Sequence, residues 1–218
     1  MGIITSTELL PAEEIKHGID LYPNIFPFNN SLVQEYCMTY QLNAKDINDL
    51  YSTFSNMDSS NYGYISIDDL LCSLRETRNS IIFPFLEGLF KLVEKKEKDF
   101  IDFFEWITMT MEYSLMNEEQ IHKFIFRIID VNNDELISKR DILLFFSREH
   151  NKKKIFPVNY LKQIEVLELD RADSISKSEF KKVLDKVPYL SYPSYRLQEQ
   201  MKYMLGNKGF WAKVYTKL

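Results

Sequence analysis

The sequence lacks the features that mark a membrane-spanning or secreted protein. No apolar stretch approaches the roughly 18 residues that a transmembrane helix needs, and there is no secretory signal. Cysteine is nearly absent: Cys37 and Cys72 lie far apart and indicate reduced thiols in an intracellular protein, although two cysteines are enough for one disulfide. We therefore expect a cytoplasmic chain.

Basic runs and catalytic motifs are equally scarce. The net charge is −5 and the longest basic run is the three lysines at 152–154, so nucleic acid is not an expected partner. The histidines, His17, His122 and His150, are scattered, and neither a glycine-rich phosphate loop nor a nucleophile motif is present. Because 45% of the 218 residues are hydrophobic, the chain can bury a real core. We expect a globular protein that is not an enzyme.

What the sequence does contain is one short template repeated four times. Each copy has isoleucine at its eighth position and an acid at its twelfth. The copies begin at Asp58, Glu94, Asp130 and Glu168, so their offsets are 36, 36 and 38 residues. The isoleucines are Ile65, Ile101, Ile137 and Ile175. Self-similarity at a nearly fixed period indicates a repeated supersecondary unit, here a helix, a loop and a helix.

Apolar stripes flank the repeated stretches and predict the helices. Before the first stretch, Ile47, Leu50 and Phe54 recur at three and four residues, which is the spacing of one helix face. The chain resembles the EF-hand proteins, and its spacing is similar to that of the two-lobed, four-hand proteins of the calmodulin, calcineurin B and neuronal calcium sensor type. The resemblance implies an all-α fold with two lobes of paired hands, whose loops pair through short β ribbons at the isoleucines.

The repeats divide the chain into four expected regions. An N-terminal extension covers residues 1–43. The first pair of hands covers 44–115, with loops at 58–69 and 94–105. The second pair covers 116–187, with loops at 130–141 and 168–179. A C-terminal helix and an aromatic tail occupy 188–218.

The third loop has the most complete set of metal ligands that the resemblance implies. An EF-hand loop places oxygen ligands at positions 1, 3, 5, 7, 9 and 12, and a glycine at position 6. Here Glu135 occupies the glycine position, where a positive φ costs on the order of 1 kcal/mol. The final acid is also an aspartate, one methylene shorter than the usual glutamate. We expect weak binding of Ca²⁺ or Mg²⁺ by Asp130, Asn132, Asp134, the Leu136 carbonyl, Ser138 and Asp141.

The first loop is a poorer candidate. It keeps the turn glycine, Gly63, but Tyr62 stands at position 5, where a phenol cannot easily reach the metal. Only two carboxylates remain, so we expect no binding at resting cytosolic Ca²⁺. The weak ligand set consists of Asp58, Ser60, the Tyr64 carbonyl, Ser66 and Asp69.

The second and fourth loops are poorer still. Lys96 and Lys98 stand at ligand positions of the second loop, and their ammonium groups would repel a metal, so we interpret this hand as purely structural. The fourth loop ends correctly in Glu179 but has Ala172 at position 5 and Asp173 at the turn. We expect little or no metal binding by either.

The N-terminus carries a lipidation pattern. Met1 and Gly2 begin a match to M-G-x-x-x-[ST], which permits N-myristoylation of Gly2. A single acyl chain gives only weak, reversible membrane binding, and no basic cluster adds to it. The acyl group can equally be buried in the protein or in a partner. The expected location is therefore cytoplasmic, with membrane-associated, cytoskeletal and ciliary locations as alternatives.

The C-terminal region carries apolar residues that must be covered. A helix predicted over 194–205 has an apolar stripe, which can dock in the groove of the chain's own C-terminal lobe or on a partner. We favour self-docking for the helix and a partner for the aromatic tail, with tryptophan as the anchor. The candidate partner-binding residues are Leu197, Met201, Met204, Phe210 and Trp211.

Two hypotheses for the function follow. In the first, the chain is a calcineurin B-like regulatory or adaptor subunit that binds a partner protein, with at most one or two weak Ca²⁺ or Mg²⁺ sites. In the second, it is a metal-independent structural subunit of a larger axonemal, cytoskeletal or membrane assembly. The partner is a helix of another protein in the first case and a larger assembly in the second.

Overall fold

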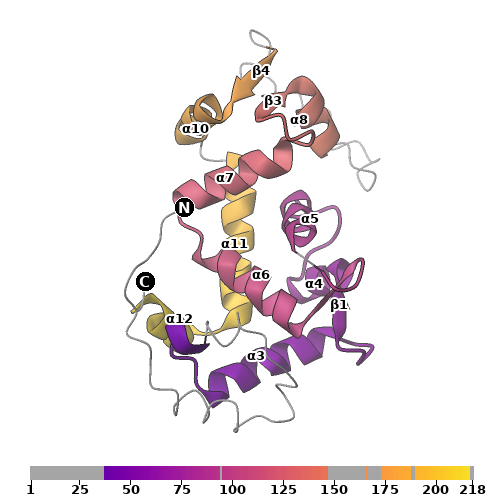
Figure 1. Ribbon diagram of the computed structural model, residues 1–218, viewed down its shortest axis with the longest axis vertical. Coiled ribbons are helices and arrows are strands. Elements are labelled where there is room, and N and C mark those ends of the chain that lie inside the picture. Colours follow the sequence, from indigo (N-terminus) through magenta and orange to yellow (C-terminus); the bar gives the residue numbers. More distant parts are fainter. Residues whose placement is uncertain (1–36, 94, 147–164, 166–172, 188–189, 217–218) are drawn as a thin grey trace.

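The computed structural model describes residues 37–93, 95–146, 165, 173–187 and 190–216. Helices make up most of this part of the chain, and strands form only two short ribbons, so the all-α expectation is confirmed (Figure 1). No helix among the described residues is long and apolar enough to cross a membrane. Cys37 and Cys72 are both free thiols. Gly2 and most of the N-terminal extension lie outside the described residues.

The first pair of hands begins with the helix before the first loop. Its elements in chain order are α3 (Ala44–Met57), β1 (Tyr64–Ser66), α4 (Ile67–Ser73), α5 (Phe83–Leu92), β2 (Phe100–Asp102) and α6 (Phe103–Leu115). Strands β1 and β2 are antiparallel, with Ile65 opposite Ile101. Both isoleucines are fully buried, so the ribbon joins the two loops and also anchors them to the core.

The second pair repeats this arrangement. Its described elements are α7 (Glu118–Ile129), β3 (Leu136–Ser138), α8 (Lys139–Phe146), β4 (Ser174–Ser176) and α10 (Lys177–Lys186). Ile137 lies opposite Ile175 in the antiparallel ribbon. The predicted pairing of the loops at their isoleucines is therefore confirmed in both lobes.

The lobes approach each other closely where α5 packs on α7. A Cβ atom at Gly88 would lie 2.6 Å from Cγ2 of Ile128, so only glycine leaves room for this contact. Only two residues separate the end of α6 from the start of α7. The buried apolar side chains of both pairs belong to one core. The lobes are therefore packed together as well as joined by the chain.

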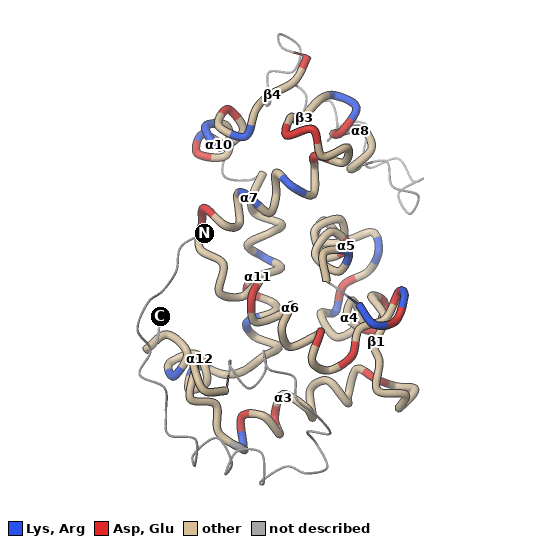
Figure 2. Tube along the Cα trace, viewed as in Figure 1, with Lys and Arg blue, Asp and Glu red and all other residues tan. Residues whose placement is uncertain are grey.

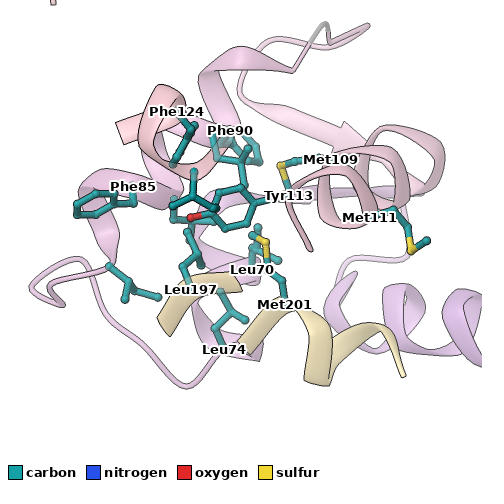
Figure 3. Packing of buried hydrophobic residues seen from close by; sticks show 14 of the residues in the cluster. Leu70, Leu74, Phe85, Phe90, Met109, Met111, Tyr113, Phe124, Leu197 and Met201 are labelled. Atoms are coloured by element: carbon teal, nitrogen blue, oxygen red, sulfur yellow. The ribbon is translucent and has the colours of Figure 1, made fainter. Parts of the chain in front are cut away.

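The first C-terminal helix, α11 (Tyr192–Leu205), docks on the chain itself. It packs mainly on α6 and also contacts α5, α3 and α7. Leu197 and Met201 are fully buried, and Figure 3 shows them in one cluster with Leu70, Leu74 and Tyr113. Self-docking of this helix is thus confirmed, but the predicted location was wrong, because the helix lies chiefly against the first pair of hands.

Buried polar contacts explain that location. The Tyr113 hydroxyl lies 2.9 Å from the Ser194 carbonyl oxygen and 2.6 Å from Ser194 Oγ. Burial raises the pKa of Tyr113, so the hydroxyl keeps its proton for this contact. The Gln198 amide donates to the carbonyls of Tyr113 and Met116, at 3.0 and 2.8 Å. These partners lie at the end of α6, which the apolar stripe alone does not identify.

The aromatic tail forms a second helix, α12 (Lys208–Tyr215), which Asn207 caps. The Trp211 indole N–H donates to the Lys202 carbonyl at 2.8 Å, and the Lys213 ammonium pairs with Asp46 of α3 at the same distance. Phe210 and Trp211 are buried. Phe210 and Trp211, which are predicted to bind a partner, thus pack on the chain itself.

Candidate metal-binding loops

The third loop is held in shape by its first residue. Asp130 lies at the end of α7 and is buried. Its carboxylate accepts the backbone N–H groups of Asp134, at 3.2 Å, and Glu135, at 3.0 Å. The oxygen at position 1 is thus oriented by the loop itself before any metal arrives.

The other carboxylates of this loop are bound by its own donors. Asp141 Oδ2 accepts both the backbone N–H and the hydroxyl of Ser138, at 3.0 and 2.5 Å. Asp134 accepts the Leu136 N–H and the Asn132 amide, each at 2.9 Å. Nowhere in the described part of the chain do three or more His, Cys, Asp or Glu side chains converge closely enough to hold a metal ion.

The donor set nevertheless has the right chemistry for a hard cation. The loop offers oxygen atoms at all six ligand positions, and oxygen is what Ca²⁺ and Mg²⁺ prefer. In the described residues no hydrogen bond reaches Asp141 Oδ1, which leaves one oxygen of this carboxylate for a metal. Binding would require Asp134 and Asp141 to exchange hydrogen bonds within the loop for the metal.

The backbone of the third loop is strained at the turn, as the sequence predicts. Glu135 has φ = 65°, in the left-handed region that glycine adopts at least cost. The equivalent residue of the first loop is Gly63, with φ = 81°, and Asn61 and Asn133 also match at 57° and 56°. The two loops therefore follow the same path, but only the first has the residue that suits it.

Replacing Glu135 with glycine is expected to raise the free energy of unfolding by about 1 kcal/mol, because it removes the positive-φ strain. The measurement is urea unfolding in EDTA. Glu135→Ala is the control, since it removes the carboxylate and keeps the strain. Equal stabilisation by both substitutions would assign the gain to loss of charge and would refute the strain argument.

The first loop has a well-held ligand at position 1 but no ligand at position 5. Burial by itself would raise the pKa of Asp58, but the Gly63 N–H, the Ser60 hydroxyl and the Tyr62 N–H donate to the carboxylate and bring its pKa below the usual range. The Tyr62 side chain is 82% exposed and does not join the loop. Asp69 is bound by Ser66, at 2.6 Å from the hydroxyl. The loop therefore has no side-chain donor at position 5 in this structure.

The second loop contains a cation of its own. The Lys96 ammonium lies 2.5 Å from Asp102 Oδ2, at position 9, and the Lys96 backbone N–H donates to Glu105, at position 12. Figure 2 shows basic and acidic residues side by side in the loop next to β1. The hydrogen bond with Asp102 raises the pKa of Lys96. These residues do not fit a divalent cation.

Only the second half of the fourth loop is described, so Ala172 lies outside the described residues, while Asp173 is exposed. Glu179 accepts the backbone N–H and the hydroxyl of Ser176, at 2.8 and 2.6 Å. This contact recurs in all four loops, where the residue at position 9 caps the exit helix and the acid at position 12 accepts its N–H. This double role is not among the sequence predictions, although a serine or aspartate three residues before an acid is the capping-box signature.

The sequence is similar to curated proteins of two kinds. Over 143 residues it is 30% identical to the type 2 calcineurin B protein of Rattus norvegicus, in an alignment that covers 64% of this chain and 79% of that protein. It is 28% identical over 115 residues to calcium-dependent protein kinase 5 of Plasmodium berghei, and 27% identical over 135 residues to the same kinase of Plasmodium falciparum. These alignments cover 52% and 59% of this chain.

The two kinds of relative differ in how much of their length is matched. The chain spans 20% and 23% of the length of the two kinases. It spans most of the calcineurin B protein. No protein-family model matches the sequence.

Proposed function

The chain belongs to the calcineurin B-like family of EF-hand proteins, and we propose that it acts as a regulatory or adaptor subunit of a partner protein. In this proposal the third loop is the one site that responds to Ca²⁺ or Mg²⁺. The protein's own role is not catalytic: it binds the partner and changes that partner's state or position.

The observation that carries this proposal is the difference between the loops. The second loop is filled by its own lysine, and the first lacks a ligand at position 5. The third offers oxygen at every ligand position, and its first residue, Asp130, ends α7. A metal that drew Asp130 and Asp141 together would therefore act directly on α7 and α8.

The position of α11 restricts where a partner helix can bind. Because α11 lies against α6, α5 and α3, it covers the parts of these three helices that it contacts, where Leu197 and Met201 are buried. We propose that the partner contacts the second pair, where Leu136 and Leu144 are exposed apolar residues. Metal binding in the third loop would then act on the lobe that holds the partner.

Calorimetric titration of the full chain with Ca²⁺ at physiological Mg²⁺ tests the metal site. We expect one binding event with a Kd near the range of about 10⁻⁷–10⁻⁵ M that EF-hand sensors show, or weaker. Asp130→Ala should abolish the heat, because it removes the ligand at position 1. Asp58→Ala is the matched control in the first loop and should leave the titration unchanged. Heat that survives Asp130→Ala would place the site elsewhere.

A second function is supported by the hydrogen bonds within the loops. Asp134 and Asp141 are already bound by donors of the third loop, and this is what a metal-independent scaffold needs. In this alternative the chain is a structural subunit of a larger assembly, and partner binding would be equal in Ca²⁺ and in EDTA. Absence of heat in the wild-type titration would favour it. Acylation of Gly2 and a cytoplasmic location remain predictions from the sequence.

A further inference from the structure

Lys96 contacts both acids at the end of the second loop. Its ammonium lies 2.5 Å from Asp102 Oδ2, and its backbone N–H donates to Glu105 Oε1 at 2.8 Å. Lys96 stands at position 3, where an EF-hand supplies a metal ligand, and the two acids stand at positions 9 and 12. The positive charge therefore lies beside the acids that would face a metal.

These contacts use all four carboxylate oxygens. Asp102 Oδ1 accepts the Glu105 N–H, and Glu105 Oε2 accepts the Asp102 N–H, both at 2.9 Å. The remaining two oxygens are those bound by Lys96. The third loop differs, because within the described residues Asp141 Oδ1 receives no hydrogen bond.

We propose that the Lys96 ammonium is the built-in cation of the second loop, which replaces a bound metal and holds the first ribbon closed without one. The ribbon transmits this effect directly: Asp102 is the residue of β2 that pairs with Tyr64 of β1. Helix α6 begins at the next residue and carries the surface on which α11 docks. The first ribbon and the start of α6 are therefore held without a metal in the second loop.

This inference does not rest on the proposed function. It concerns the first lobe alone, whereas the proposed metal response belongs to the third loop. A chain with no metal site at all would satisfy it equally.

The test is amide hydrogen exchange followed by NMR on the full chain in EDTA. We expect Lys96→Met to speed exchange in the first ribbon, residues 64–66 and 100–102, by about two- to fivefold, the size expected for a partly exposed ion pair. The second ribbon, residues 136–138 and 174–176, is the internal control. Lys98→Met is the matched variant, because Lys98 has the same charge and, in the described residues, no ion pair. Equal effects of the two substitutions would overturn the proposal.

A gain of metal binding tests the same idea from the other side. The double variant Lys96→Asp, Lys98→Asp replaces the ammonium with carboxylates at positions 3 and 5. Addition of Ca²⁺ should slow exchange in its first ribbon and leave the wild-type first ribbon unchanged. A wild-type first ribbon that responds to Ca²⁺ would overturn the proposal, and so would a double variant that does not. Exchange is measured in the first ribbon and not in the third loop. Either result therefore leaves the proposed metal site of the third loop to be tested by the calorimetric titration.

Discussion

Replacing Leu197 with alanine is expected to lower the free energy of unfolding by about 2–5 kcal/mol. Leu197 is fully buried where α11 meets the first pair of hands, so the substitution removes apolar contact and leaves a cavity in a close-packed core. Urea unfolding of the full chain measures the effect, and a lower midpoint with an unchanged slope would identify a loss of stability.

Tyr203→Ala is the matched control on the same helix. Its side chain is 89% exposed, and a surface substitution of this kind changes stability by no more than about 0.5 kcal/mol. If α11 were instead only weakly bound to the first pair of hands, so that a partner could displace it, Leu197→Ala would also lower the free energy of unfolding very little. The difference between the two variants therefore measures how firmly the helix is docked.

Replacing Trp211 with alanine is expected to cost about 3–5 kcal/mol, because a buried aromatic ring is lost. Its indole N–H donates to Lys202, and its ring contacts those of Phe210 and Tyr215. Thermal unfolding should show a large fall in Tm.

The conservative variant Trp211→Phe keeps an aromatic ring at this position. It loses the bond to the Lys202 carbonyl and only part of the buried volume, so we expect a smaller loss, of about 1–3 kcal/mol. A Trp211→Ala variant as stable as wild type would mean that the tail is detached in solution, which would restore the interpretation of this residue as a partner anchor.

The features that recur along the chain could be predicted from the sequence. The isoleucines at position 8 fix the register of both ribbons, because side chains in a strand alternate and only one register buries them. The strained turn at Glu135 follows from the same template, since a non-glycine residue stands where the loop needs a positive φ. Both predictions depend on local geometry alone.

The location of α11 could not be predicted in this way. Its apolar stripe indicates burial but suits either lobe, and the choice depends on polar partners that are distant in sequence. Tyr113 and Ser194 are 81 residues apart, and a single hydroxyl contact has no periodicity to reveal it. The pairing of Lys96 with Asp102 is similar: the sequence shows a cation that excludes metal, but not that its ammonium binds Asp102 while its backbone N–H binds Glu105.

The contact at Gly88 has a mechanical consequence. Ile128 lies against the Gly88 backbone with no space for a methyl group between them, and it is two residues before Asp130. A turn of α7 about its axis, or a tilt of its end as the third loop closes, would press Ile128 on the Gly88 backbone. We therefore expect a movement that begins at Asp130 to reach α5.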